Sequence, residues 1–435
     1  MKNISRLFRF IKRAFSSRRK RFWMHATLGT IFIFLLIGFV VQVFSRLNFL
    51  DPVGDALKDI EVTDLVFSRL RGEPAADEHI VIVNIARLDR RGIAEQLRII
   101  NKYKPRVVGI DVLFEGEKKE DPMGDAVLAE VLSETNNLVM VSKVNDYDEG
   151  SDGYRQLEKS HPMFSRYGVT GHANLTTEAL SQEQYKSSRM FMTKPIVNGE
   201  EELAFAIKVA ALYDPDAAKA FVDRSNDTEI INFRGNALGG TGGFGNKFYA
   251  LDVADIFREN FTPDLIKNKI VLMGFMGEGF NDLTTIEDKF YTPLNPQYAG
   301  RAFPDMFGVV IHANILAMIL NKDFIDTMPA FISTVVNILL CFFNVVLFSW
   351  IYFRFPLWYD GVTKTLQLIE TFLLLLLVIL FFHWFNYALN FTLGIASILL
   401  ASDALEVYHS VIRNALTDKA GRLYFLEKKR RNQNL

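Results

Sequence analysis

The stretch HIVIVNIARLDRRGIAEQLRIINKYKPRVVGIDVLF (79–114) decides the fold of the larger part of this 435-residue chain. It opens and closes on apolar, β-branched runs, and the segment 90–103 between them has apolar residues at helical spacing. Strands that read as continuous apolar runs are buried on both faces, as in parallel sheets. The stretch therefore predicts a strand–helix–strand unit of a parallel sheet.

The same alternation continues along the chain. Further strand-like runs lie at 137–144, 228–235 and 268–275, and helix-like segments lie at 121–134 and 201–213. Strands that alternate with helices are typical of α/β domains. We predict an α/β domain over 46–327, with a mostly parallel sheet flanked by helices.

Charge divides the chain into three parts, although the net charge is only −1. Residues 1–45 carry nine Lys or Arg and no acid, residues 46–328 carry a net −13, and residues 329–435 carry +3. Basic segments stay cytoplasmic under the positive-inside rule, so we expect the ends inside and the acidic middle outside. The near-neutral balance argues against nucleic-acid binding.

Long charge-free runs predict four transmembrane helices. FWMHATLGTIFIFLLIGFVVQVFS (22–45) is long enough to cross a bilayer as an uncleaved anchor. The basic segments 1–21 and 409–435 both belong in the cytoplasm, which requires an even number of spans. The other three are predicted at 328–353, 366–386 and 388–408. We therefore expect a multi-pass protein of the bacterial inner membrane, with a periplasmic domain and both termini cytoplasmic.

The basic N-terminal segment 1–21 also predicts contact with membrane lipids. Its apolar residues recur at helical spacing between Arg and Lys, which fits an in-plane helix on an anionic leaflet. A disordered orientation signal fits the same composition.

The order of several motifs resembles the CHASE sensory domains of type two. Asp64 follows the first apolar run, and VIVNIA, KPRVVGIDVLFEG, NFRG (232–235), KIVLMGFMGEGFNDL (269–283) and GVVIHANILAMIL (308–320) come in order. The resemblance implies a sensory domain outside the cytoplasm, followed in typical members by a cytoplasmic output domain. Only 27 residues follow Tyr408, too few for such a domain. We expect a stand-alone form that acts through a separate membrane or cytoplasmic partner protein.

Five residues are candidates for ligand binding. Asp111 follows a predicted strand at the edge where ligands of open sheets collect, although a carboxylate bonded to loop amides fits equally. The loop 274–282 exposes amides that can hold an anion, but we favour a tight turn capped by Asp282. His312 lies in an apolar helix, where a packed core residue is the favoured interpretation over a proton sensor. The candidates are Asp111, Arg234, Gly277, Asp282 and His312.

Other chemistry finds little support. The single cysteine, Cys341, excludes an intrachain disulfide, and the histidines lack metal-ligand spacing. No nucleophile elbow is present, so we expect no enzyme, metal or cofactor. The tail has an apolar helix face that can dock a partner's cytoplasmic helix or lie on the membrane. That face comprises Leu405, Tyr408, Ile412 and Leu416.

Together these features predict a sensor or receptor subunit without its own enzyme. It would bind an unidentified extracytoplasmic signal and relay it to a separate partner protein. The alternative is a structural or accessory subunit of a larger cell-envelope membrane complex, with no ligand.

Overall fold

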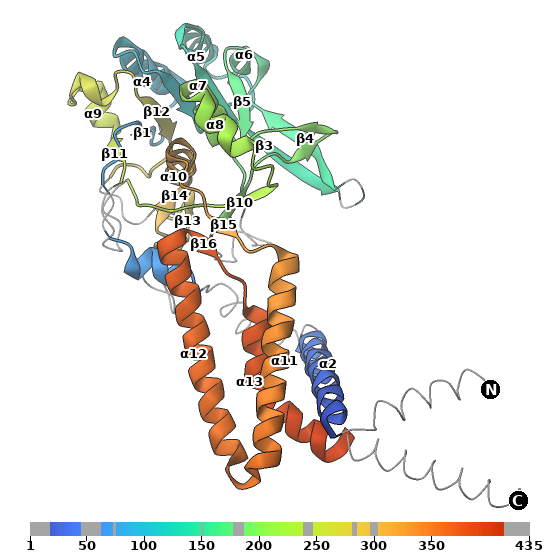
Figure 1. Ribbon diagram of the computed structural model, residues 1–435. Coiled ribbons are helices and arrows are strands. Elements are labelled where there is room, and N and C mark those ends of the chain that lie inside the picture. The colour runs from blue at the N-terminus through green and yellow to red at the C-terminus, as the bar shows by residue number, and fades with distance from the viewer. Residues whose placement is uncertain are drawn as a thin grey trace, which may run out of the picture. The chain divides into compact units, whose positions relative to one another are not determined.

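The computed structural model describes residues 18–44, 62–72, 75–148, 150, 152–176, 187–237, 247–280, 285–295 and 303–412. The chain forms two compact units (Figure 1). One unit comprises residues 58–325, and the other comprises residues 1–57 and 326–435. Each unit has its own buried apolar core.

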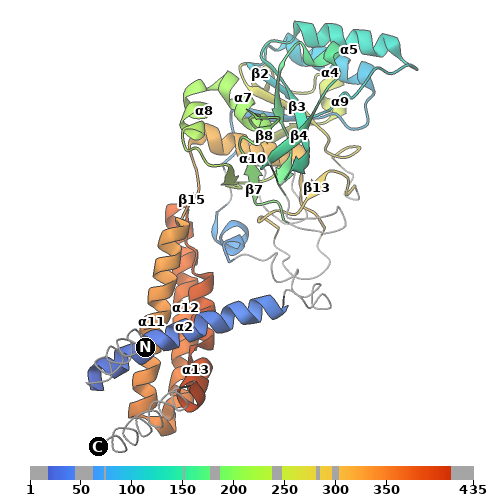
Figure 2. The same cartoon turned by 90° about the vertical axis from the view of Figure 1, so that its right-hand side faces the viewer.

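The 58–325 unit is built on a sheet whose strand order is β11-β1-β12-β2-β3-β4-β8-β9, with β5 also paired to β3 (Figure 2). From β11 to β3, and between β3 and β5, neighbours run parallel, while β4 runs antiparallel to β3. The predicted mostly parallel sheet is confirmed. The strands are β1 Ile80–Asn84, β2 Val107–Ile110, β3 Leu138–Asp148, β4 Gly153–Lys159, β5 Val169–His172, β8 Ile196–Val197, β9 Glu200–Glu201, β11 Tyr249–Leu251 and β12 Ile270–Gly274.

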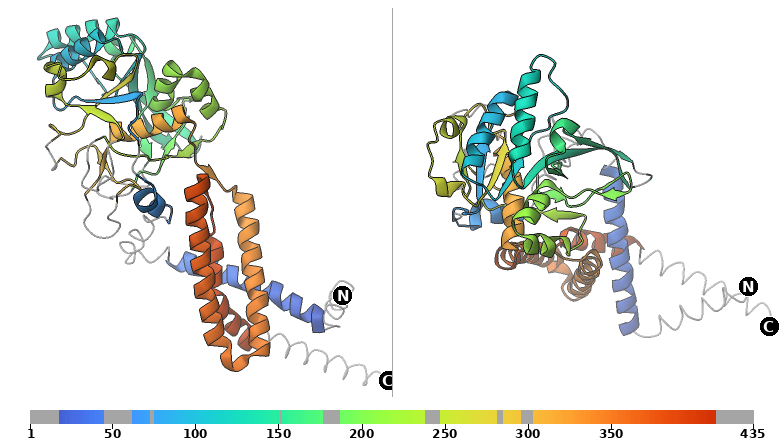
Figure 3. Two further views of the ribbon diagram at one scale, coloured as in Figure 1. Left: turned by 60° about the vertical axis from the view of Figure 1, so that its left-hand side comes forward. Right: turned by 90° about the horizontal axis from the view of Figure 1, so that it is seen from above.

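Helices cover both faces of the sheet (Figure 3). Helices α4 (Arg90–Lys102) and α5 (Pro122–Glu134) bury their apolar sides against alternate residues of the central strands, Val81 and Val83 among them. Helices α7 (Phe205–Tyr213) and α10 (Gly308–Asn321) lie against the opposite face. The shorter helices are α6 (Pro162–Ser165), α8 (Pro215–Val222) and α9 (Val253–Phe257).

Two glycines allow the close approach of α7 and α10. A Cβ at Gly109 would lie 2.8 Å from the Phe205 ring, and a Cβ at Gly274 would lie 2.6 Å from Val309 Cβ. Contacts this short are not tolerated, so these positions require glycine for the helices to sit where they do. Helix α10 is consequently held tightly against β12.

The predicted strand at 228–235 does not belong to the parallel sheet. β10 (Thr228–Ile230) pairs antiparallel with β7 (Met190–Met192), which pairs with β6 (Leu175–Thr176). The NFRG motif follows β10 without regular secondary structure. The edge beside β1 is occupied by the short β11, which carries no long apolar run. A small antiparallel pair is formed by β13 (Lys289–Phe290) and β14 (Met306–Phe307).

The described part of the other unit is mainly helical. Its helices are α2 (Arg18–Phe44), α11 (Ala330–Arg354), α12 (Tyr359–Phe385) and α13 (Thr392–Val407), which continues as a π-helix over Tyr408–Ile412. Three segments, Phe22–Gln42, Ala330–Arg354 and Pro356–Phe385, are long and apolar enough to cross a membrane. Helix α13 has 16 residues and is not among them, so a fourth span is not confirmed.

The two ends of this helical unit are marked by side-chain and strand contacts. β15 (Asp326–Thr327) pairs with β16 (Tyr387–Ala388), which places the start of α11 beside the end of α12. At the other end of α13, the Tyr408 hydroxyl lies 3.0 Å from His25 Nδ1, near the start of α2. Helix α13 therefore runs from the β16 end of the unit toward the start of α2.

Polar side chains tie α13 to its neighbours. Asn337 on α11 accepts from the Gly394 N–H at 3.0 Å, and Gln367 on α12 donates to the Ile398 carbonyl at 2.6 Å. In an apolar surrounding, hydrogen bonds of this kind hold helices in one register.

Candidate functional site

The carboxyl edge of the parallel sheet brings together Asp111 and His312, two residues that were predicted separately. Asp111 follows β2 directly, and His312 lies in the first half of α10, where it is 4% exposed. Burial raises the pKa of Asp111, and the His312 charge opposes this change. Burial lowers the pKa of His312, and the Asp111 charge opposes that change. The two groups therefore interact at one site, which we call the Asp111 site.

Three further titratable side chains belong to the Asp111 site, and none was predicted. Burial of its carboxyl group, followed by the charge of Asp111, raises the pKa of Asp288. The Lys143 ammonium lowers the pKa of both carboxyls. His172, the last residue of β5, has its pKa lowered to about 4 by burial and, next, by the His312 charge.

His172 has unused hydrogen-bonding capacity. Its side chain is 1% exposed, and neither ring nitrogen meets hydrogen-bond geometry with a described residue, although the backbone of Met192 lies near the ring. An unsatisfied buried polar group costs about 1–3 kcal/mol, so proteins keep few of them without a bound water, a ligand or a function. The Asp111 site thus contains a buried imidazole whose ring nitrogens form no well-aligned hydrogen bond with a described residue.

The chemistry of the Asp111 site is that of polar recognition and proton binding. Two carboxyls, two imidazoles and one ammonium meet where parallel strands end, which is the usual ligand position in open α/β sheets. Among the described residues, no group of three or more His, Cys, Asp or Glu is arranged to hold a metal ion. The site can exchange hydrogen bonds and charge with a small polar ligand.

The glycine-rich loop after β12 is held as a structural turn. Asn84 Nδ2 donates to Asp252 Oδ1 at 2.9 Å and to the Gly277 carbonyl at 3.2 Å, and Asn84 Oδ1 accepts from the Met276 N–H at 2.9 Å. Gly277 has φ 86°, in the left-handed region that glycine adopts without strain. Gly277 therefore serves the turn, and Asp282 lies outside the described residues.

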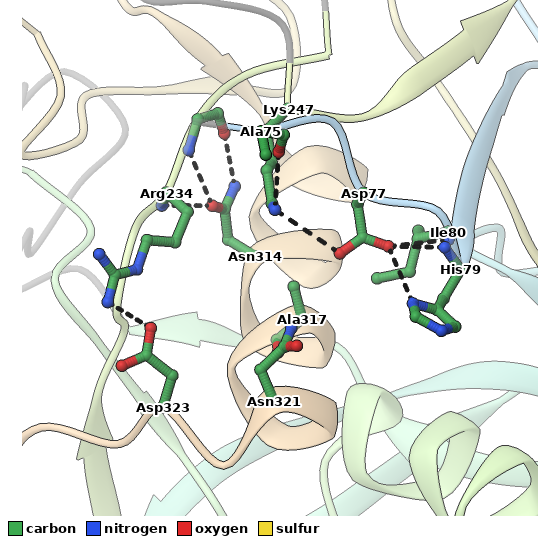
Figure 4. A network of polar contacts seen from close by, with 11 residues as sticks. Ala75, Asp77, His79, Ile80, Arg234, Lys247, Asn314, Ala317, Asn321 and Asp323 are labelled. Atoms are coloured by element: carbon green, nitrogen blue, oxygen red, sulfur yellow. Dashed lines mark hydrogen bonds and ion pairs between the residues drawn. The ribbon is translucent and has the colours of Figure 1, made fainter. Parts of the chain in front are cut away.

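Arg234 belongs to a different group of polar residues (Figure 4). Its guanidinium forms an ion pair with Asp323, and its backbone N–H donates to Asn314 Oδ1 at 2.9 Å. Asn314 Nδ2 donates back to the Gly235 carbonyl at 3.0 Å. Asn314 lies on α10 and Asp323 follows the end of that helix, so α10 holds the NFRG segment at both points.

Arg71 joins this group to the segment that follows the first apolar helix. Arg71 Nη1 donates to Asn232 Oδ1 at 2.6 Å and to the Phe233 carbonyl at 2.8 Å. Asn232 Nδ2 in turn donates to the Asp323 carbonyl at 2.7 Å. Burial, aided by the charge of Arg234, lowers the pKa of Arg71 to about 9. We call Arg71, Asn232, Arg234, Asn314 and Asp323 the NFRG cluster.

The motifs that build these two sites match a known family. The chain matches the CHASE2 domain family over residues 30–352. It belongs to the CHASE2 family. A CHASE2 domain is a sensory domain of extracellular type, and with three candidate membrane helices it fits a membrane protein. No curated protein and no solved structure matches the chain.

Asp64, a residue of the family resemblance, and Thr292 both have structural partners. Asp64, 3% exposed at its side chain, pairs with Arg189 at 2.5 Å, which anchors the segment that follows the first apolar helix. Thr292 donates through its hydroxyl to Asp305 Oδ2 at 2.5 Å and through its N–H to Asp305 Oδ1 at 2.9 Å. Both pairs fix loops rather than expose groups to a ligand.

Two of the four residues of the predicted docking face are buried against other helices of the same chain. Leu405 is 0% exposed and Tyr408 is 2% exposed, in the apolar core that α13 shares with α2 and α11. Helices of the same unit cover these two side chains, and contact with a partner stays a prediction. The side chain of Ile412 and all of Leu416 lie outside the described residues.

The residues that sequence reasoning missed in this CHASE2 domain share one property. His172, Asp288 and Lys143 lie in segments without a recognisable motif, and the strand ends that bring them to Asp111 are far apart in sequence. The available signal was the position of His172 and Lys143 in segments that become β5 and β3. That signal had meaning only once β3 was placed beside β2, and β5 beside β3.

Proposed function

We propose that this CHASE2 protein is a sensor subunit of the bacterial inner membrane that binds a small polar signal at the Asp111 site and relays it to a separate partner protein. The observation that carries the proposal is the position of α10. One helix places His312 in the Asp111 site and, two residues later, Asn314 in the NFRG cluster.

The physical basis of the relay is the rigidity of α10. The helix is buried along nearly its whole length and packs on Gly274 without room for a methyl group. Packed elements move as bodies rather than deform, so a ligand that displaces His312 also displaces Asn314. The ligand can shift this equilibrium only by its difference in affinity for the two positions of α10.

The proposal includes four membrane spans, with both termini cytoplasmic and the CHASE2 domain periplasmic. It is supported by the direction of α13, which leaves the β16 end and reaches His25 at the start of α2. With its π-helical continuation, α13 extends from Thr392 to Ile412. We expect the basic N-terminal segment to contact lipid, and we expect no enzymatic activity, cofactor or nucleic acid.

Native purification in mild detergent with mass spectrometry tests the relay. We expect a partner protein to copurify with the full chain, and we expect its amount to change in Asp111→Asn and His312→Gln. Asp264→Asn, which changes an exposed carboxyl outside the site, is the matched control. Recovery of the chain alone under all growth conditions would contradict a separate partner.

The alternative is an accessory subunit that holds a membrane complex together without a ligand. It is favoured because Gly277 and Arg234, two of the predicted ligand residues, form contacts within the chain itself. A partner present in constant amount, and unaffected by Asp111→Asn and His312→Gln, would support the accessory subunit over the sensor.

A further inference from the structure

An open cavity lies at the surface of the 58–325 unit, lined by residues that belong to neither the Asp111 site nor the NFRG cluster. Its volume is about 480 Å³. Ligand pockets commonly measure about 300–1,000 Å³, so a small organic molecule fits. The cavity lies where the end of β4, the segment after α6, the start of β5 and α7 come together.

Three cations line this cavity from three separate elements. Lys159 ends β4, Arg166 follows α6, and Lys208 lies on α7. Among the described residues, none of the three forms an ion pair with a carboxylate. Arg166 donates only to the hydroxyl of its neighbour Tyr167, at 2.9 Å, and lies over that ring. The guanidinium and both ammonium groups therefore keep donors for a ligand.

The charge of this cavity is unusual for its surroundings. Residues 46–328 carry a net −13, yet the cavity has three cations and one carboxylate, that of Glu202. Glu202 Oε1 is engaged by the Ser142 hydroxyl at 3.1 Å. The three cations outnumber the one carboxylate and repel one another, and an anion that enters the cavity relieves this repulsion.

Two hydroxyls add neutral donors to the cations. Ser165 and Thr170 also line the cavity, and a hydroxyl can donate to a carboxylate or phosphoryl oxygen. Hydrogen bonds between charged donors and ionised oxygens are the strong class in proteins. The lining thus supplies both the charge and the hydrogen bonds that an oxyanion needs.

We infer that this cavity binds a small organic dianion or trianion of the carboxylate or phosphoryl class. Each of the three cations of the lining can pair with an anionic oxygen of such a ligand, and the volume suits a small organic molecule. The inference does not depend on the proposed function, because it uses no residue of the Asp111 site and no relay.

Calorimetric titration of the full chain in detergent micelles with citrate, and separately with inorganic phosphate, tests the inference. We expect wild-type protein to bind at least one of the two probes. Arg166→Gln and Lys208→Gln should each weaken binding by about tenfold, because each removes one charge-assisted contact. Lys267→Gln, an exposed lysine outside the cavity, is the matched control and should leave the affinity unchanged.

A variant that should strengthen binding distinguishes a change in affinity from a loss of folded protein. Glu202→Gln keeps an amide oxygen that can accept from Ser142 but removes the repulsive charge, so it should tighten binding severalfold. Asp264→Asn, which removes an exposed carboxyl outside the cavity, should leave the affinity unchanged. No binding of either probe at millimolar concentration, or equal affinities in wild type, Arg166→Gln and Lys208→Gln, would overturn the inference.

Discussion

Arg71 and Asn232 form the contact on which the NFRG cluster depends. Arg71 Nη1 donates to Asn232 Oδ1 at 2.6 Å, and Asn232 donates onward to the Asp323 carbonyl at 2.7 Å. One asparagine therefore joins the segment that follows the first candidate membrane helix to the segment that precedes the second. Both hydrogen bonds are partly buried. Loss of either partner therefore leaves a polar group that water cannot readily reach to replace the lost bond.

Removal of the Arg71 guanidinium should destabilise the full chain. Arg71→Met deprives Asn232 and the Phe233 carbonyl of their donor, and we expect a loss of about 2–3 kcal/mol. The measurement is the thermal unfolding midpoint in detergent micelles. Arg155→Met, whose guanidinium is paired with Asp148 at the surface, should cost about 0.5 kcal/mol or less. Equal losses in the two variants would contradict a special role for Arg71.

Asn84 should be the most sensitive side chain at the strand ends. Asn84→Leu preserves approximate size but removes one donor from Asp252 and leaves the Met276 N–H without its acceptor, so we expect a loss of about 2–4 kcal/mol. Asn260→Ala, which removes one long contact on an exposed side chain, should shift the unfolding midpoint little. A small effect of Asn84→Leu would show that the turn at Gly277 does not depend on this amide.

A methyl group at Gly274 should push α10 away from the sheet. The new Cβ would lie 2.6 Å from Val309 Cβ, and we expect Gly274→Ala to cost about 1–3 kcal/mol by overpacking. Adding Val309→Ala should recover part of this loss, because it vacates the space that the methyl group needs. Gly116→Ala, where nothing lies within 4 Å of the new Cβ, is the control. Independent, additive effects of the two substitutions would contradict direct contact.

Protonation of His172 should destabilise the folded chain at low pH. Burial lowers its folded-state pKa to about 4, whereas the unfolded chain titrates near ~6.5. Between these values the unfolded state binds more protons, so stability is lost as the pH falls from ~6.5 to about 4. His172→Gln should flatten this part of the profile of unfolding midpoint against pH. His79→Gln, which removes an imidazole with 54% side-chain exposure, should retain it. An unchanged slope in His172→Gln would refute the assignment.

Reporter fusions should decide the number of spans. A fusion between α11 and α12, at Pro356, should report the cytoplasm, and a fusion at Ala388 should report the periplasm. A fusion after Ile412 should again report the cytoplasm if α13 crosses. A fusion in β4 serves as the control for the periplasmic domain. A periplasmic signal after Ile412 would reduce the spans to three.

Local sequence predicted the elements of the sheet well where one run of residues decides the structure. Strands β1, β2 and β12 lie within the predicted apolar runs, and α4 lies within the predicted amphipathic segment. The misplaced strand is the run at 228–235, because an apolar, β-branched run fits any sheet. Pairing of β10 with β7 depends on partners elsewhere in the chain.

The candidate site was also predictable from the sequence only in part. Asp111 and His312 were predictable as single residues, one from its place after a strand and the other from its apolar helix. Their interaction with each other and with His172 depends on how α10 packs against β1, β12 and α7. The helical spacing of Leu405 and Tyr408 likewise did not indicate what covers them. An apolar helix face has the same sequence pattern whether another chain or α2 packs against it.

The sequence by itself determined the sensory family, the alternation of strands and helices, and the segments apolar enough for a membrane, because these depend on composition and short-range periodicity. Only the tertiary structure decided which titratable groups share the Asp111 site, which polar residues form the NFRG cluster, and which cations line the cavity between β4, β5 and α7. The physical reason is that burial and electrostatic interaction depend on distance in space, and the residues concerned come from strands and helices far apart along the chain.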